Sequence, residues 1–231
     1  MVSIAILDLT GPSPEMEGMA TAGEVIETWL ARALPSDSLT VIPVAAGAAL
    51  PEIAMFDSYL ISGSEKGVYD EAPWMKAARS FLLSAKDAGK PLFGICFGHQ
   101  LMADTFGGKA ELSSAGERVG IERFAFNGDT FAAHVWHRDQ VTELPPGARI
   151  AGDADYCPYG ILEYDFGAAS IQFHPEIERA YFDEAVARLS GNHFTKPRAV
   201  EIRASIASGE VAPDLFAEQA ARVLTGGRLI A

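Results

Sequence analysis

The sequence has few cysteines, a deficit of basic residues and no long apolar run. Two of its 231 residues are cysteines, which excludes a disulfide framework and favours a reducing compartment. The 18 lysines and arginines against 31 aspartates and glutamates give a net charge of -13, which argues against nucleic acids and anionic membranes as partners. No apolar run reaches the ~18 residues of a membrane span, and the first residues lack the pattern of a secretion signal. We therefore expect a cytoplasmic protein.

The first half of the chain alternates short apolar segments with helical patterns. The apolar segments are rich in strand-forming residues and end in turn residues, whereas the segments between them have the spacing of amphipathic helices. We expect strands at residues 2–9, 39–44, 56–64 and 91–95, and helices at 20–34, 73–88 and from about 98 to 107. This alternation predicts βαβ units around a parallel sheet with both faces covered.

The second half has a different pattern. From residue 110 to about 165 several strand-like stretches are separated by turns, which predicts antiparallel hairpins that extend the sheet. A last central strand is expected at 167–173 and helices at 178–189 and 213–224. Residues 1–231 are thus predicted to form one α/β domain, with a mostly parallel sheet, an antiparallel edge extension and helices on both faces. A helical extension is expected at about 195–231.

Cys96 stands at a strand-to-helix junction in the sequence Gly94-Ile95-Cys96-Phe97-Gly98. This G-x-nucleophile-x-G pattern is typical of a nucleophile elbow, whose sharp turn tolerates only glycine beside the nucleophile. The amides at the start of the following helix would favour the thiolate form of Cys96. We therefore predict that Cys96 is a nucleophile, whereas Cys157 lies beside Pro158 with no motif around it and is expected to be a buried structural residue.

A base for this nucleophile is expected from the end of a neighbouring strand. His174 lies where the apolar strand before it ends, and Glu176 follows two residues later after a proline. A carboxylate that accepts a hydrogen bond from one imidazole nitrogen fixes the tautomer and stabilises the imidazolium. Cys96, His174 and Glu176 are therefore predicted to form a catalytic triad.

The segments Gly94-Ile95-Cys96-Phe97-Gly98-His99-Gln100 and Phe173-His174-Pro175-Glu176 resemble the two signature motifs of the class I, triad-type, glutamine amidotransferases. The glutaminase domain of that family has a flavodoxin-like fold. The resemblance implies that Cys96 attacks the side-chain amide of glutamine and that His174 transfers the proton. Ammonia then leaves, and water hydrolyses a γ-glutamyl thioester to release glutamate. It implies no cofactor.

The intermediate of such a reaction needs oxyanion donors. By the logic of the elbow these are the backbone amide after the nucleophile, which belongs to Phe97, and one amide from a nearby strand-loop junction. We expect the second donor to be Gly63, in a loop similar to the family's glycine loop. Ser64 departs from the family pattern there, because a Gly-Pro step often follows at that place.

Three further residues are candidates for the substrate pocket. Gln100 resembles the family's glutamine that lines this pocket, and His137 and Asp139 occupy a segment comparable to one that abuts it. An alternative for His137 and Asp139 is that they hold their loop by hydrogen bonds. A metal site at His134 and His137 is a weaker alternative, because no further ligand set has a familiar spacing. His193 is interpreted as part of a surface loop.

The motifs leave three functions open. The chain is either a self-sufficient hydrolase of glutamine or another γ-glutamyl compound, the glutaminase subunit of an amidotransferase with a separate synthetase partner, or a non-catalytic module. We favour the first, and the intact triad argues against the third. The sequence contains neither a P-loop nor a Ser-Gly-Gly-x-Asp-Ser type loop for pyrophosphate, so no ATP-dependent synthetase step is expected here. Glu65, Asp70 and Asp139 are candidate partners for the substrate's α-amino group.

Overall fold

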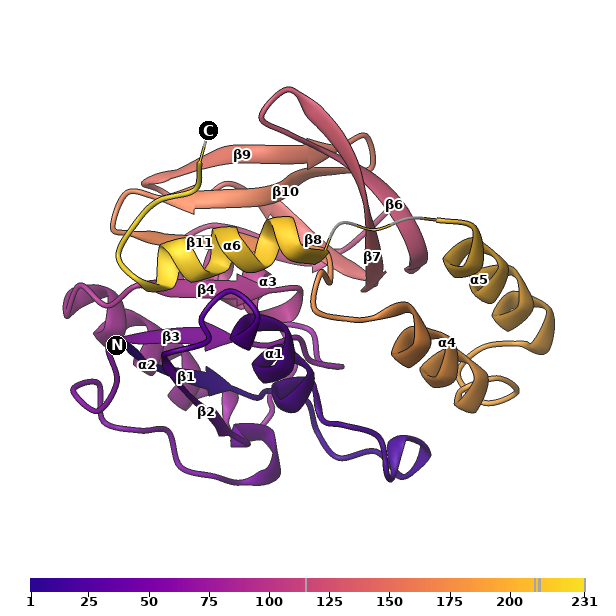
Figure 1. The fold of residues 1–231 in the computed structure, drawn as a ribbon, viewed down its shortest axis with the longest axis horizontal. Coiled ribbons are helices and arrows are strands. Elements are labelled where there is room, and N and C mark those ends of the chain that lie inside the picture. The colour runs from indigo at the N-terminus through magenta and orange to yellow at the C-terminus, as the bar shows by residue number, and fades with distance from the viewer. Residues whose placement is uncertain (115, 210, 212, 231) are drawn as a thin grey trace.

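The computed structural model describes residues 1–114, 116–209, 211 and 213–230. In this part of the chain a nine-stranded sheet lies between two layers of helices (Figure 1). No helix in the described ranges is both long and apolar enough to span a bilayer.

Five strands form the parallel half of the sheet. They lie side by side in the order β2 (Ser38–Ile42), β1 (Ser3–Leu7), β3 (Ser58–Ile61), β4 (Leu92–Ile95) and β11 (Ala168–Ile171). All four neighbouring pairs are parallel. This order is that of flavodoxin-like sheets, in which ligands bind beyond the carboxyl ends of the strands. The predicted fold class is therefore confirmed.

The antiparallel extension continues from β11. Its strands, in spatial order, are β10 (Cys157–Tyr164), β9 (Ala148–Ala154), β6 (Arg118–Phe126) and β7 (Asp129–His137). Each pairs antiparallel with its neighbour. A separate two-stranded sheet joins β5 (Lys109–Leu112) to β8 (Asp139–Glu143).

Helices cover both faces of the parallel half. On one face α1 (Ala22–Ala31) and α6 (Pro213–Leu224) share an apolar cluster with Ile4 and Ile6 of β1. On the other face α2 (Met75–Asp87) and α3 (Phe97–Thr105) pack with Ala5 and Leu7. The alternation along β1 follows from the period of two of a strand, so a fully apolar strand needs cover on both sides.

Two more helices lie at the antiparallel end. The helices α4 (Arg179–Arg188) and α5 (Lys196–Ser208) contact each other and lie beside β6 and β7 (Figure 1). Their apolar cluster contains Phe182, Val186 and Ile202, with Trp136 of β7 packed against it. Two short 3₁₀ segments complete the described elements, η1 (Pro14–Met16) and η2 (Val44–Ala46).

The C-terminal helix belongs to the core and packs near the end of β11. Phe216 of α6 is fully buried, and its ring centroid lies 4.7 Å from that of Phe173 and 5.0 Å from that of Phe131. Phe173 directly precedes His174 in the sequence. The packing of α6 therefore supports the strand end from which His174 projects.

This packing predicts a large effect of Phe216→Ala. Removal of a fully buried aromatic ring leaves a cavity, so the free energy of unfolding should fall by about 3–5 kcal/mol. Leu215→Ala on the same helix is the matched control, because Leu215 is 38% exposed, and it should cost less than about 1 kcal/mol. Urea denaturation of both variants measures the difference. Equal losses would contradict the placement of α6 in the core.

Candidate active site

Cys96 lies at a strained turn between β4 and α3. Its φ is 52°, in the left-handed region that non-glycine residues rarely adopt. The two glycines around it are sterically required. A Cβ on Gly98 would lie 2.3 Å from the backbone oxygen of Ile61, and one on Gly94 would lie 2.8 Å from the backbone of Gly98. The local geometry is thus that of a nucleophile elbow.

The Cys96 sulfur is nearly buried and has two polar neighbours. It lies 3.6 Å from the backbone oxygen of Trp136, and the Gln172 side-chain nitrogen donates to it at 3.7 Å. The Gln172 amide oxygen in turn accepts from Gln100 at 3.2 Å. Sequence reasoning missed Gln172, which comes directly after β11. The available signal was its place two residues before His174 in the predicted strand at 167–173, because such residues share a face of a strand.

His174 and Glu176 follow β11 and contact each other. Nδ1 of His174 lies 2.7 Å from Oε1 of Glu176, and the two residues are 8% and 5% exposed. Burial alone would lower the pKa of His174, but the charges of Glu176 and Cys96 and hydrogen bonds to both raise it well above the ordinary value. The structure therefore brings Cys96, His174 and Glu176 together at one edge of the sheet.

The loop after β3 presents backbone amides to this cluster. A Cβ on Gly63 would lie 3.3 Å from Cε1 of His174 and 3.8 Å from Cβ of Cys96. The Gly63 carbonyl accepts hydrogen bonds from Ser62 Oγ at 2.8 Å and Thr10 Oγ1 at 3.1 Å. Among the described residues, no acceptor is bonded to the amides of Gly63, Ser64 or Phe97. These amides are therefore available to a developing oxyanion.

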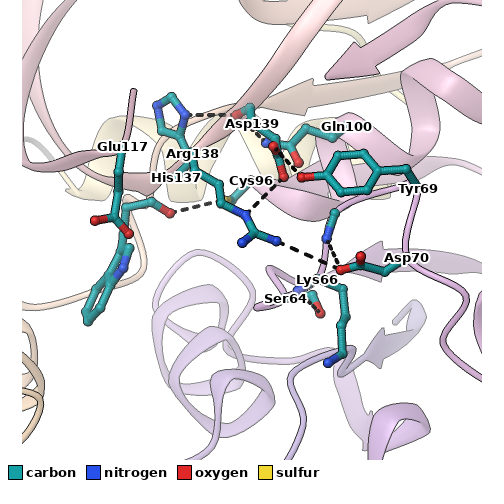
Figure 2. A network of polar contacts seen from close by, with 12 residues as sticks. Ser64, Lys66, Tyr69, Asp70, Cys96, Gln100, Glu117, His137, Arg138 and Asp139 are labelled. Atoms are coloured by element: carbon teal, nitrogen blue, oxygen red, sulfur yellow. Dashed lines mark hydrogen bonds and ion pairs between the residues drawn. The ribbon is translucent and has the colours of Figure 1, made fainter. Parts of the chain in front are cut away.

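The three candidate pocket residues form a buried network beside Cys96 (Figure 2). Gln100 donates to the backbone oxygen of Asp139 at 2.7 Å, and His137 Nδ1 donates to the same oxygen at 2.9 Å. The Asp139 carboxylate accepts from the Tyr69 hydroxyl at 3.0 Å. Burial lowers the pKa of His137 to about 4, so its imidazole is neutral near pH 7. These contacts hold the loop after β7. They agree with the alternative prediction that His137 and Asp139 hold their loop by hydrogen bonds.

Arg138 is the charged group that this network presents at the surface. Its guanidinium lies between two carboxylates, with Nε 3.6 Å from Asp139 and Nη2 3.9 Å from Asp70, and its side chain is 48% exposed. Figure 2 shows the Arg138 side chain pointing toward Asp70, with the Tyr69 hydroxyl at Asp139. We call Tyr69, Asp70, Arg138 and Asp139 the Arg138 cluster. Sequence reasoning did not select Arg138 or Tyr69.

A largely apolar pocket of about 390 Å³ lies next to Cys96 and His174. Cys96, His174, Glu176 and Gly63 line it, whereas Gln100, His137 and the Arg138 cluster do not. Its walls come from the loop after β1, from α1, from α4 and from Trp136. His193 lies in an exposed loop, as predicted, where it also lines the pocket and is paired with Glu117 at 3.1 Å.

The remaining histidines and the second cysteine have structural partners. His134 Nδ1 donates to the Ile177 carbonyl at 2.8 Å, and His99 Nδ1 lies 2.8 Å from Ser170 Oγ. Burial is the largest cause that lowers the pKa of His99 to about 3 and raises that of Cys157 to about 12. Within the described ranges, no three His, Cys, Asp or Glu side chains are grouped as metal ligands would be.

Comparison with known proteins decides the family. A family model described as glutamine amidotransferase class-I matches residues 22–191. The chain belongs to this family. The match includes Cys96, His174 and Glu176 and ends before α5 and α6. Membership in this enzyme family agrees with the chemistry of the groups around Cys96.

Proteins with different named functions are similar to this chain. A glutamine-hydrolysing GMP synthase of Azoarcus sp. (strain BH72) is 32% identical over 182 residues, which cover 66% of this chain and 34% of that protein. Gamma-glutamyl peptidase 2 of Arabidopsis thaliana is 25% identical, with 65% of each chain covered. A solved glutamine amidotransferase structure from Methylobacillus flagellatus has a TM-score of 0.76 at 20% identity, with 100% of this chain and 96% of that chain covered.

The raised pKa of His174 predicts how this residue responds to the loss of Glu176. The charge of Glu176 raises the His174 pKa, so Glu176→Gln should move the midpoint of the His174 titration to lower pH. Glu178→Gln is the matched control, because this carboxylate is 61% exposed. Proton NMR of the His174 ring across a range of pH measures both variants, and an unchanged midpoint in Glu176→Gln would refute the coupling.

Proposed function

We propose that the protein hydrolyses the γ-glutamyl amide bond of glutamine or a related γ-glutamyl compound through a thioester on Cys96, and releases ammonia or an amine. The observation that carries this proposal is the strained Cys96 beside His174, whose imidazole is held by Glu176. Nucleophile, base and orienting carboxylate are the parts that acyl transfer requires.

In the first half of the reaction the Cys96 thiolate adds to the γ-carbonyl carbon, and the carbonyl electron pair moves to oxygen. The Phe97 amide and the amide of Gly63, or of Ser64 next to it, stabilise this oxyanion. The C–N bond then breaks as the His174 imidazolium gives its proton to the leaving nitrogen. The products of this half are the γ-glutamyl thioester and a free amine or ammonia.

In the second half the neutral His174 takes a proton from water, and the hydroxide oxygen adds to the thioester carbon. Collapse of this intermediate breaks the C–S bond, returns the Cys96 thiolate beside the His174 imidazolium and releases glutamate. Glu176 holds the Nδ1 proton of His174 throughout and stabilises the imidazolium. Glu176 is therefore a positioning residue in this mechanism.

The Arg138 cluster suits the amino acid end of a γ-glutamyl group. An α-amino acid carries a carboxylate and an ammonium on one carbon, and Arg138 with Asp70 and Asp139 offers both complementary charges. Arg138 follows two residues after Trp136, whose backbone oxygen lies 3.6 Å from the Cys96 sulfur. A guanidinium binds a carboxylate through parallel hydrogen bonds. Gln100 and His137, which bind the backbone oxygen of Asp139, act on the substrate in this proposal through the position of Arg138 and Asp139.

A second candidate function is that of a glutaminase subunit with a separate synthetase partner. The similarity to glutamine-hydrolysing GMP synthases favours it. The two candidates differ in what the isolated chain does: a self-sufficient hydrolase turns over its substrate alone, whereas a subunit requires its partner. The free amides of Gly63 and Phe97 next to Cys96 support the self-sufficient hydrolase.

Replacement of the nucleophile tests the proposal directly. Cys96→Ala should lower glutamate release from glutamine and from γ-glutamyl amides by at least about 10⁴-fold, because no other group can form the thioester. Cys157→Ala, which removes the buried cysteine outside the site, should retain activity. Coupled assays for glutamate and ammonia on the purified chain measure both. Turnover by Cys96→Ala near that of the parent protein would refute the mechanism.

The roles of His174 and Glu176 predict unequal losses. His174→Ala removes the group that transfers the proton and should lower kcat by about 10²- to 10⁴-fold. Glu176→Gln keeps an oxygen that can accept from Nδ1, so its loss in kcat should be at least about tenfold smaller. Steady-state kinetics on the same substrate compare them. Equal losses would instead assign Glu176 a role in proton transfer or folding.

A further inference from the structure

We infer that the leaving amine carries an apolar substituent without a carboxylate, so that the preferred substrate is an N-substituted γ-glutamyl amide and not glutamine. The inference rests on the proposed function and names the substrate class of the same site. The apolar pocket next to Cys96 and His174 would hold the substituent.

The chemistry of the leaving group fixes where its substituent lies. His174 must protonate the leaving nitrogen, so this nitrogen lies on the His174 side of the γ-carbonyl. His174, Glu176 and Cys96 all line the apolar pocket. The Arg138 cluster, which suits the amino acid end, lies outside it. A group attached to the leaving nitrogen therefore enters the pocket.

The pocket is larger and less polar than ammonia requires. Its volume of about 390 Å³ is within the range of small-molecule sites, about 300–1,000 Å³, whereas a molecule of the size of water occupies about 30 Å³. Its walls include the apolar residues Met16, Val25, Ile177, Phe182 and Leu189 together with Trp136. The Trp136 and Phe182 rings are stacked, with centroids 5.4 Å apart. An alkyl or aryl group is the chemical complement of such a wall.

The segment between β1 and α1 is fastened over the pocket by α4 and the loop after it. Arg188 donates to the Glu17 carbonyl at 2.7 Å, Asn192 donates to the Glu15 carboxylate at 2.9 Å, and Tyr181 donates to the Ala20 carbonyl at 2.8 Å. Figure 1 shows the 3₁₀ turn of this segment lying alongside α4, away from the sheet. Two segments that lie far apart in sequence therefore form part of the pocket wall together.

The charges of the pocket select against a leaving group that is itself an acid. Glu65 and Glu176 line it, and none of the described residues that line it is a lysine or arginine. Glu65 is already paired with Lys66 at 3.4 Å and Glu176 with His174 at 2.7 Å, so a free carboxylate on the leaving amine would compete with these carboxylates for the same partners. Neutral alkyl or arylalkyl amines fit this environment, whereas the amino acid released from a γ-glutamyl dipeptide does not.

The decisive measurement compares leaving groups on one γ-glutamyl scaffold. We would determine kcat/KM for glutamine, N-γ-glutamyl methylamine, N-γ-glutamyl 2-phenylethylamine and γ-glutamyl phenylalanine. The phenylethyl amide should exceed glutamine by about 100-fold, because even one methylene in an apolar pocket is worth about tenfold or more. It should also exceed γ-glutamyl phenylalanine, which differs by one carboxylate.

A pair of methionine variants tests whether the pocket is responsible. Met16 lines the pocket, whereas Met19 lies in the same segment outside it, and both are half-buried. Met16→Gln should lower the ratio of kcat/KM for the phenylethyl amide to that for glutamine by about tenfold. Met19→Gln should leave both values unchanged. An unaltered ratio in Met16→Gln would overturn the assignment of the pocket.

The failure of this inference and that of the proposed function have different signatures. Turnover of glutamine that equals or exceeds turnover of the phenylethyl amide, with dependence on Cys96, would overturn the inference alone. No Cys96-dependent turnover of any of the four compounds by folded protein would overturn the proposed function, and the inference with it.

Discussion

The close approach of the turn after β4 to the end of β3 is the constraint on which the site depends. At this point Gly98 lies against the Ile61 carbonyl so closely that a single methyl group would collide with it. The contact forces the chain to turn sharply, which places Cys96 in a left-handed conformation above the sheet. Because β3, β4 and β11 are parallel neighbours, their carboxyl ends then bring Gly63, Cys96 and His174 to one edge.

The surroundings of Cys96 are divided into a charged part and an apolar part. The loops after β3 and β7 and the first residue of β8 supply the Arg138 cluster, whereas α1 and α4 supply apolar walls. In the proposed reaction His174 stands at the border, where it gives its proton to the leaving nitrogen. The proposal therefore assigns the two ends of a γ-glutamyl amide to different elements of the fold, so that the leaving group can vary without disturbing the groups around the γ-carbonyl.

The sequence motifs predicted those parts of the candidate site that depend on residues close together in the chain. The elbow around Cys96 and the pair His174 and Glu176 each depend on neighbours within a few residues, and the alternation of strands and helices predicted the sheet that joins them. The apolar pocket depends on the fastening of residues 13–20 to α4, more than 150 positions later, by Arg188 and Tyr181. No periodicity encodes such a contact. For the same reason the spacing that predicted a helix at 213–224 did not indicate that Phe216 packs on Phe173.

The charges at the site differ from the net charge of the whole chain. With a net charge of -13 the protein repels anions at long range, yet a γ-glutamyl group brings an α-carboxylate to Cys96. In the proposed reaction Arg138, whose guanidinium is held by Asp70 and Asp139, binds that carboxylate, and the same two side chains bind the α-ammonium. A second carboxylate, on the leaving amine, would meet Glu65 and Glu176 instead. In this proposal the charge distribution thus suits a zwitterion at one end of the substrate and a neutral, apolar group at the other.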